Sequence, residues 1–256
     1  EQRGGGGVAG EVAGMEGAGH SLLGGGEEGL PGQRGAVRDG GGGGWGKGDP
    51  AGLRGREVAS VGAGEAQPPG RAEAARFAAE LGAGGLLVTS GLADGVDGAA
   101  HAAALDAGQP TVAVIGTGPD RVYPRKHHAL ARRIVEKGAI VSEYPPGTHA
   151  QPHHFPQRNR IIAGLSLGVL VIEAGVKSGS LTTARQAAEQ GREVFALPGS
   201  IPNPLAQGCH ALIAAGPRLV PPPHEILPAL APAPLQPRAA LRAPPCRQAS
   251  GARTAR

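Results

Sequence analysis

Residues 86–115 read LLVTSGLADGVDGAAHAAALDAGQPTVAVI, and the pattern changes twice along this stretch. The apolar run Leu86–Ser90 is followed by the alanine-rich stretch Val96–Ala107, which Gly108 ends, and then by a second apolar run, Thr111–Ile115. Short apolar runs predict buried strands, and an alanine-rich stretch that stops at a glycine predicts a helix. The segment therefore predicts a β-α-β unit whose two strands run parallel.

The same alternation extends over most of the chain. Further strands are expected at Val58–Gly62, Ala139–Ser142, Leu167–Ile172, Glu193–Leu197 and Arg218–Val220. Further helices are expected at Gly70–Leu81, His127–Lys137, Arg160–Leu165, Leu181–Gln190 and Leu205–Ala215. Apolar runs without alternation are typical of a parallel sheet that helices cover on both faces. We therefore predict an α/β fold with a Rossmann-like, doubly wound and mostly parallel sheet.

Glycine and proline divide the chain into three segments. The 256 residues include 46 glycines and 24 prolines, and 21 of those glycines fall within residues 1–48. Residues 221–256 contain nine prolines and five arginines but only one acidic residue. Neither segment has the apolar periodicity that a packed core needs, so both are expected to lack regular structure. The Rossmann-like domain is expected at residues 49–220, a length sufficient for its own core.

Positive charge is concentrated in the middle of the chain. Residues 57–120 carry two basic and eight acidic side chains, whereas residues 121–185 carry ten basic and three acidic ones. This local excess predicts a polyanionic ligand.

Composition also excludes several classes of protein. No run of about 18 apolar residues exists, which argues against a membrane-spanning helix. The two cysteines, Cys209 and Cys246, are too few for a disulfide framework or a structural zinc site. The neighbouring pairs His127-His128 and His153-His154 lack further ligands at a metal-binding spacing. We expect a cytoplasmic protein without a metal or other cofactor.

The stretch Lys177–Thr183, KSGSLTT, is a candidate phosphate site. It follows an apolar strand and opens a helix, where backbone N–H groups and hydroxyls can bind an anion. Helix capping by Ser178 or Ser180 is the alternative interpretation. Capping needs one hydroxyl and this stretch offers four, which favours a ligand.

A second candidate lies at Gln157–Ile162, QRNRII, just after Phe155. Arginines can bind phosphates with two parallel hydrogen bonds, and a phenylalanine can stack on an unpaired base. The alternative places Phe155 in the core and pairs an arginine with Glu143 or Glu173.

Other sites are less well supported. Gly62-Ala63-Gly64 begins like a dinucleotide fingerprint but lacks the third glycine, and the chain contains no Walker motif, so ATP hydrolysis is not expected. Asp97 and His101 lie one helical turn apart. We interpret them as a structural hydrogen bond at the start of a helix, with a catalytic pair as the alternative. Cys209 is expected to pack in the core.

Several motifs together resemble one family. The run Ser90–His101, SGLADGVDGAAH, is similar to the SGLAxGID..AH signature of the DprA/Smf DNA-processing proteins. The matching motifs continue in order with AVIGTGPD at 113–120, YP at 123–124, SEYPPG at 142–147, HFPQRNRIIAGLS at 154–166, SGSLTTA at 178–184, PGS at 198–200, NP at 203–204 and GCH at 208–210.

The resemblance implies an extended Rossmann fold that binds single-stranded DNA, protects incoming DNA and loads the RecA recombinase during natural transformation. It also implies a homodimer formed through the C-terminal part of the Rossmann domain, with no catalytic activity. Together with the residue patterns it gives these candidate DNA-binding residues: Gly62, Ser90, Gly91, Gly116, Thr117, Gly118, Arg121, Phe155, Arg158, Asn159, Arg160, Lys177, Ser178, Gly179, Ser180 and Thr182.

The chain departs from the family pattern in two places. Val61–Gly64 stands where the family has a VGSR-like turn, so the serine and the phosphate-binding arginine are missing. Pro152 stands where family members often carry a lysine. Losing one charge-assisted contact costs about 1.5–3 kcal/mol, which predicts DNA affinity weakened by about one to two orders of magnitude.

Two alternatives to the DNA-binding function remain. One is a nucleotide N-glycosidase of the lysine-decarboxylase-like type, although its PGGxGTxxE signature is missing. The other is a degraded, non-functional copy of a family member.

Overall fold

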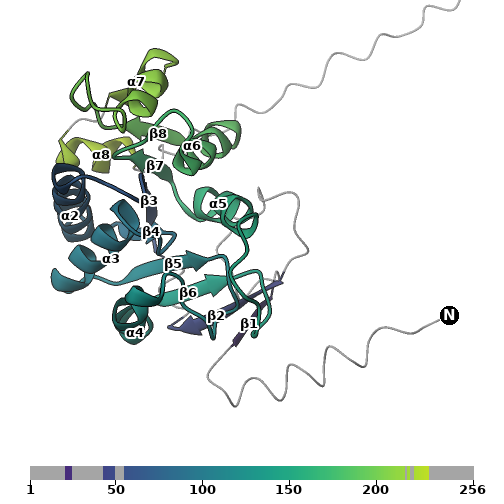
Figure 1. Ribbon diagram of the computed structural model, residues 1–256. Coiled ribbons are helices and arrows are strands. Elements are labelled where there is room, and N and C mark those ends of the chain that lie inside the picture. The colour runs from purple at the N-terminus through teal and green to yellow at the C-terminus, as the bar shows by residue number, and fades with distance from the viewer. Residues whose placement is uncertain (1–20, 25–42, 50–54, 217, 220–221, 231–256) are drawn as a thin grey trace, which may run out of the picture.

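The computed structural model describes residues 21–24, 43–49, 55–216, 218–219 and 222–230 (Figure 1). Its strands are β1 (Ser21–Gly24), β2 (Gly43–Gly48), β3 (Glu57–Val61), β4 (Leu87–Ser90), β5 (Thr111–Ile115), β6 (Ala139–Ser142), β7 (Gly168–Val171), β8 (Glu193–Ala196) and β9 (Arg218–Leu219). Its helices are α2 (Pro68–Ala83), α3 (Val96–Asp106), the 3-10 helix η3 (Arg125–His127), α4 (His128–Lys137), α5 (His154–Leu165), α6 (Gly179–Glu189), α7 (Gln207–Ala214) and α8 (Pro223–Ala229).

The strands form one nine-stranded sheet in the order β1-β2-β6-β5-β4-β3-β7-β8-β9. All pairs from β6 to β9 are parallel, and β1 and β2 extend the β6 edge as an antiparallel pair. The chain winds outward from the central strand β3 to β6 and then crosses back to β7, β8 and β9. This is the doubly wound, mostly parallel sheet that the sequence predicts, so the prediction of the fold class is confirmed.

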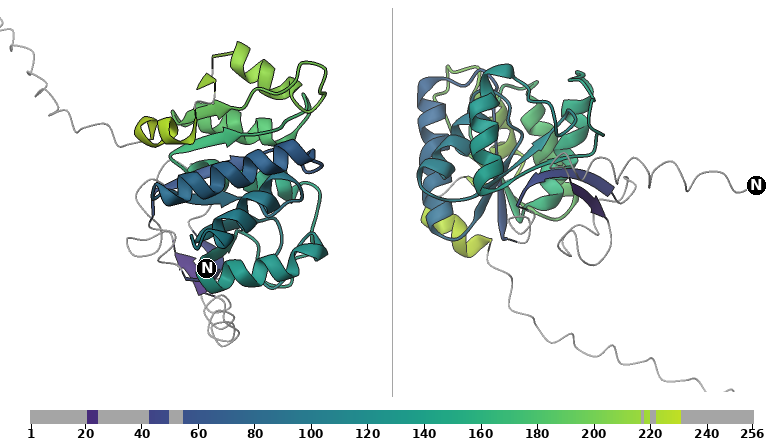
Figure 2. Two further views of the ribbon diagram at one scale, coloured as in Figure 1. Left: turned by 90° about the vertical axis from the view of Figure 1, so that its left-hand side faces the viewer. Right: turned by 90° about the horizontal axis from the view of Figure 1, so that it is seen from below.

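Helices cover both faces of the sheet. One core contains Ala59 and Val171 from the strands with Ile162 and Leu181 from α5 and α6. On the other face, strand residues such as Val58 and Leu170 belong to a core with α2 and α8, and α3 and α4 continue this layer (Figure 2, left). None of the helices among the described residues is long and apolar enough to cross a bilayer.

Helix α5 is longer than the sequence predicted. It begins at His154, not at Arg160. Pro156 lies in its first turn, where a missing N–H costs no intrahelical hydrogen bond, so the proline does not delay the helix. Phe155, which the expected bounds leave outside the helix, therefore belongs to its first turn.

The described fold extends beyond the expected domain bounds, 49–220, at both ends. Ile226 of α8 and Leu230 are buried, with 0% and 4% exposure, and pack against Phe77 of α2. Within residues 1–48, Ser21–Gly24 and Gly43–Gly48 form an antiparallel pair of strands, in which Leu22 lies opposite Trp45. The rest of the two terminal segments lies outside the described residues.

His101 is a fully buried polar residue of α3. Its Nδ1 lies 2.8 Å from Thr111 Oγ1, which in turn donates to the Val88 carbonyl at 2.6 Å. Because the threonine hydrogen is used in that second bond, His101 Nδ1 is the donor, and its Nε2 has no hydrogen-bond partner among the described residues. Burial lowers the pKa of His101 to about 3, so the imidazole is neutral in the fold. Asp97 bonds elsewhere, and the expected contact between Asp97 and His101 does not form.

His101 should make stability fall in mild acid. Its pKa is about 3 in the fold against about 6.5 in the unfolded chain, so its contribution is complete above pH 6.5 and is lost as pH falls toward 3. We expect a loss of up to about 1.4 kcal/mol per pH unit in this window, measured by urea unfolding. His101→Gln removes this titration and leaves the carboxylates of the protein unchanged. The stability of the variant should therefore fall less steeply with falling pH. Parallel curves for the two proteins would contradict the prediction.

Candidate functional site

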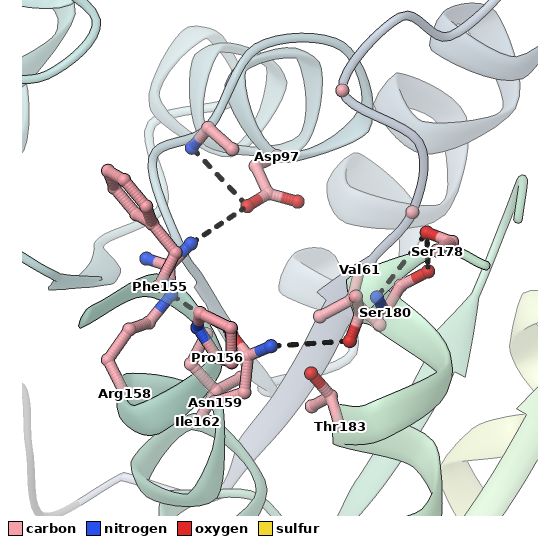
Figure 3. Close-up of a pocket in the computed structure, with 14 residues that line it drawn as sticks. Val61, Asp97, Phe155, Pro156, Arg158, Asn159, Ile162, Ser178, Ser180 and Thr183 are labelled. Carbon is pink, nitrogen blue, oxygen red and sulfur yellow. Dashed lines mark hydrogen bonds and ion pairs between the residues drawn. The ribbon is translucent and has the colours of Figure 1, made fainter. Parts of the chain in front are cut away.

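A pocket of about 200 Å³ lies where the winding of the sheet reverses, at the carboxyl ends of β3, β4 and β7 (Figure 3). Four segments line it: Val61, Gly62 and Gly64 at the end of β3 and just after it; Ala93 and Asp97 around the start of α3; Phe155, Pro156, Arg158, Asn159 and Ile162 of α5; and Ser178, Gly179, Ser180 and Thr183 at the start of α6. Ligands of open α/β sheets bind at this kind of position. Seven of the candidate residues predicted from sequence line this one pocket: Gly62, Phe155, Arg158, Asn159, Ser178, Gly179 and Ser180.

The start of α6 forms one wall of the pocket. Ser178 is the N-cap: its Oγ accepts from the Ser180 N–H at 3.4 Å and lies 2.7 Å from Ser180 Oγ. Beside it, the N–H of Gly179 occupies the first helical position, which has no acceptor within a helix. Gly179 is exposed, and a Cβ there would meet only Asn159 Nδ2, at 3.9 Å. Ser178 therefore caps this helix end, and the Gly179 N–H has no intrahelical acceptor.

Arg158 is buried, with 5% of its surface exposed, and its guanidinium points into the protein. It donates to the carbonyls of Gly91 and Val114, and its Nε donates to Asn159 Oδ1 at 3.0 Å. Asp97 lies 4.0 Å away as its counter-charge. The side chain predicted to bind phosphate is thus occupied by the protein's own acceptors.

Asp97 completes this buried pair. Its Oδ2 accepts from the Gly91 N–H at 3.1 Å and from the Ala93 N–H at 3.3 Å. Burial raises the pKa of the Asp97 carboxyl, and the neighbouring Arg158 opposes that rise. Burial likewise lowers the pKa of Arg158, and Asp97 opposes that change. The pair thus places two opposite charges in the pocket wall, and their hydrogen bonds are all made within the fold.

Ser90, the last residue of β4, and Gly91, which follows it, lie next to the buried pair. A Cβ on Gly91 would lie 2.1 Å from Arg158 Nη2, so only glycine leaves room for the guanidinium. Ser90 is fully buried and donates to the Ser60 carbonyl of β3 at 2.5 Å. Neither residue lines the pocket, and both fix the strands beneath it.

The loop after β5 lies beside the pocket without lining it. A Cβ on Gly116 would come within 3.2 Å of Phe155 Cδ1, so this glycine lets the aromatic ring approach the loop. Thr117 donates to the Arg121 carbonyl at 2.8 Å, and the Gly118 N–H donates to the Thr148 carbonyl at 3.0 Å. The first bond closes the loop on itself, and the second ties it to the loop that follows β6.

The remaining cations lie around the pocket. Arg160 forms an ion pair with Glu143, which agrees with the alternative considered for one of the two arginines. Lys177 is exposed next to the start of α6, and Arg121 is partly exposed with its Nε 3.7 Å from Asp120. Thr182 is half-buried outside the pocket, and Thr183 lines it instead.

Helical periodicity could have found some of the pocket residues that the sequence analysis missed. Thr183 follows Ser180 by three residues, and Ile162 follows Asn159 by three, so each pair shares a helix face. Val61, Gly64, Ala93 and Pro156 carry no chemical signal of their own. Among the described residues, no three His, Cys, Asp or Glu side chains gather where they could hold a metal ion.

The known sequences that match this chain all belong to one family of DNA-processing proteins. The family model of DNA recombination-mediator protein A matches residues 44–231. Protein Smf of Escherichia coli is 53% identical over 152 residues, which cover 59% of this chain and 41% of that protein. The DNA processing protein DprA of Streptococcus pneumoniae is 53% identical over 135 residues, covering 53% and 48%. The chain thus spans about half the length of these relatives or less.

Solved structures agree with the sequences. DprA from Streptococcus pneumoniae superposes with a TM-score of 0.76 at 42% identity, covering 79% of this chain and 71% of that one. DNA processing protein A from Helicobacter pylori, whose structure was reported for its single-stranded DNA binding mode, gives 0.74 at 27% identity, covering 82% and 95%. Because the family model spans almost all of the described fold and solved members share its architecture, this chain belongs to the DNA recombination-mediator protein A family.

Proposed function

We propose that this chain binds single-stranded DNA through the pocket between α5 and α6. The observation that carries the proposal is the pairing of Phe155, an aromatic ring lining the pocket, with the open N-terminus of α6 on another wall (Figure 3). A base can stack on the ring while a phosphate meets the Gly179 N–H at the positive end of α6. Family membership supports the same ligand, as does the single-stranded DNA named for the Helicobacter pylori structure.

The shape of the pocket favours a single strand over a duplex. A base must leave its pair to reach an aromatic ring inside a pocket of about 200 Å³. Stacking accepts any base, and a backbone N–H at the start of α6 contacts phosphate alone, so binding should depend little on sequence. Exposed Lys177, next in sequence to Ser178 of the pocket wall, adds positive charge there, and binding should weaken as salt rises.

We infer a binding function without a catalytic step. The two charged side chains lining the pocket, Asp97 and Arg158, bond to backbone groups and lie 4.0 Å from each other. Neither is free to act on a ligand as a general base or as an electrophile. An assay for nucleotide release tests the N-glycosidase alternative, and release of a free base would contradict this inference.

We also propose the larger role that the resemblance implies. A strand held in this pocket would be protected and passed to RecA in the cytoplasm during natural transformation. Homodimerisation through the C-terminal part of the domain is part of the same proposal. Ile201, 81% exposed on the loop that follows β8, provides apolar surface in that part. RecA filament formation on DNA coated by a single-strand-binding protein, with and without the full chain, tests the loading role.

Fluorescence anisotropy of a labelled oligothymidylate, titrated with the full chain at low and moderate salt, tests DNA binding directly. We expect tighter binding to the single strand than to a duplex of equal length, and weaker binding at higher salt. Phe155→Leu should lower the single-strand affinity about tenfold, because it removes one stacking surface. Phe155→Tyr keeps the ring and should bind normally. A folded protein that binds no single strand would overturn the proposal.

Gly64→Arg should strengthen binding. Gly64 is exposed at the pocket, and a Cβ there meets nothing within 4 Å, so the arginine that the family resemblance implies can be added without a clash. One charge-assisted phosphate contact predicts an affinity about 10- to 100-fold higher, with a steeper salt dependence. Gly64→Gln adds similar length without charge and should show neither effect. Equal gains in the two variants would refute the electrostatic explanation.

Arg158→Leu should act on stability before it acts on binding. The substitution leaves the Asp97 carboxylate buried without its counter-charge, which typically costs about 3–5 kcal/mol. Arg160→Leu, which breaks the more exposed pair with Glu143, should cost about 1 kcal/mol or less. Urea unfolding compares the two variants. Unchanged stability of Arg158→Leu together with weakened DNA binding would show that Arg158 contacts DNA itself.

A further inference from the structure

Tyr123 is an exposed aromatic residue next to the pocket. Its side chain is 54% exposed, and its ring centroid lies 5.4 Å from that of Phe155, with the ring planes tilted by 38°. Phe155 lines the pocket and Tyr123 does not. The two rings therefore make an aromatic surface that begins inside the pocket and continues outside it.

Tyr144, on the loop after β6, differs from Tyr123 because its contacts within the fold account for its position. Its ring stacks on His154 at 3.9 Å between centroids, and its hydroxyl donates to Gln157 Oε1 at 2.8 Å. Tyr123 has no hydrogen bond to another described residue, and Phe155 is its one described ring partner. Tyr144 is thus held on both its ring and its hydroxyl, whereas much of the Tyr123 ring is free to contact a ligand.

Two arginines flank Tyr123 on the same loop. Arg121 precedes it by two residues, and its only described counter-charge is Asp120, 3.7 Å away. Arg125 follows it by two residues, is exposed, and forms no ion pair with the other described residues. Binding grooves for single-stranded nucleic acid combine aromatic rings with cations, because bases stack on the rings and phosphates contact the cations. Residues 121–125 have this combination.

We propose that Tyr123 stacks a second base of the bound strand, next to the base on Phe155, so that the strand leaves the pocket across residues 121–125. This inference rests on the proposed binding of single-stranded DNA. A base held between two rings needs about 7 Å, because each stacked contact takes about 3.5 Å. The observed 5.4 Å is too short for that arrangement, so each ring carries its own base.

Thymidylates of increasing length, from the mononucleotide to about 16 nucleotides, test the inference with the full chain. We expect Tyr123→Leu to bind the mononucleotide as the unchanged protein does, because a single nucleotide fills only the pocket. It should bind the longer ones about tenfold more weakly, because one stacked base is lost. Tyr123→Phe keeps the ring and should match the unchanged protein at every length.

The outcomes separate a DNA contact from a structural role. If Tyr123 only supported Phe155, Tyr123→Leu would weaken binding equally at all lengths, and that result would overturn the inference. Equal binding by both proteins at all lengths would overturn it as well. If the unchanged protein bound no oligonucleotide, the proposed function itself would fail, and this inference with it.

A fluorescent variant gives a second readout. Tyr123→Trp places an indole at the proposed contact, and the chain has one other tryptophan, Trp45, whose signal the unchanged protein supplies. Stacking on a base should quench the added emission with longer oligonucleotides and not with the mononucleotide. Emission that stays constant at saturating DNA would contradict the contact.

Discussion

The buried guanidinium of Arg158 is the contact on which the pocket depends. A buried cation is costly unless it is paired and hydrogen-bonded, and here the Gly91 and Val114 carbonyls, Asn159 Oδ1 and the Asp97 carboxylate surround it. Two of these groups lie at the carboxyl ends of β4 and β5, and a third starts α3. One side chain therefore fixes α5 to the ends of β4 and β5 and to the start of α3.

The position of the pocket walls follows from that contact. Phe155 lies one turn before Arg158 on α5, so anchoring the arginine also sets the position of the ring. Asn159, the next residue, donates from Nδ2 to the Gly179 carbonyl at 3.2 Å and so links α5 to the start of α6. On the other side, buried Glu173 accepts from the Gln67 N–H at 2.9 Å and ties the end of β7 to α2. Buried polar groups thus connect the segments that line the pocket.

The sequence predicted the sheet well because its strands are apolar runs bounded by glycine or polar residues. Thr111–Ile115 and Ala139–Ser142 agree with the structure to the residue. The strands β1 and β2 gave no clear signal, because Ser21–Gly24 has only two apolar residues and Gly43–Gly48 has one tryptophan among glycines. The prolines around α8 concealed a helix that packs through Ile226. In the pocket, the motifs predicted which segments meet. They could not predict which way Arg158 points, because that depends on carbonyls 67 and 44 residues away along the chain.

The structure separates charges that shape the site from charges that can contact a ligand. Arg158 and Asp97 belong to the first group, since their strong contacts are internal. Arg160 is held by Glu143, which leaves Lys177, Arg121 and Arg125 as the more exposed cations around the pocket. Because buried Arg158 cannot turn outward without abandoning Asp97, it cannot replace an arginine missing at Gly64. In the proposed function, affinity for single-stranded DNA therefore comes from the α6 N-terminus, from stacking on Phe155 and from these exposed cations. The base contact proposed at Tyr123 adds a second stacking surface to these contributions.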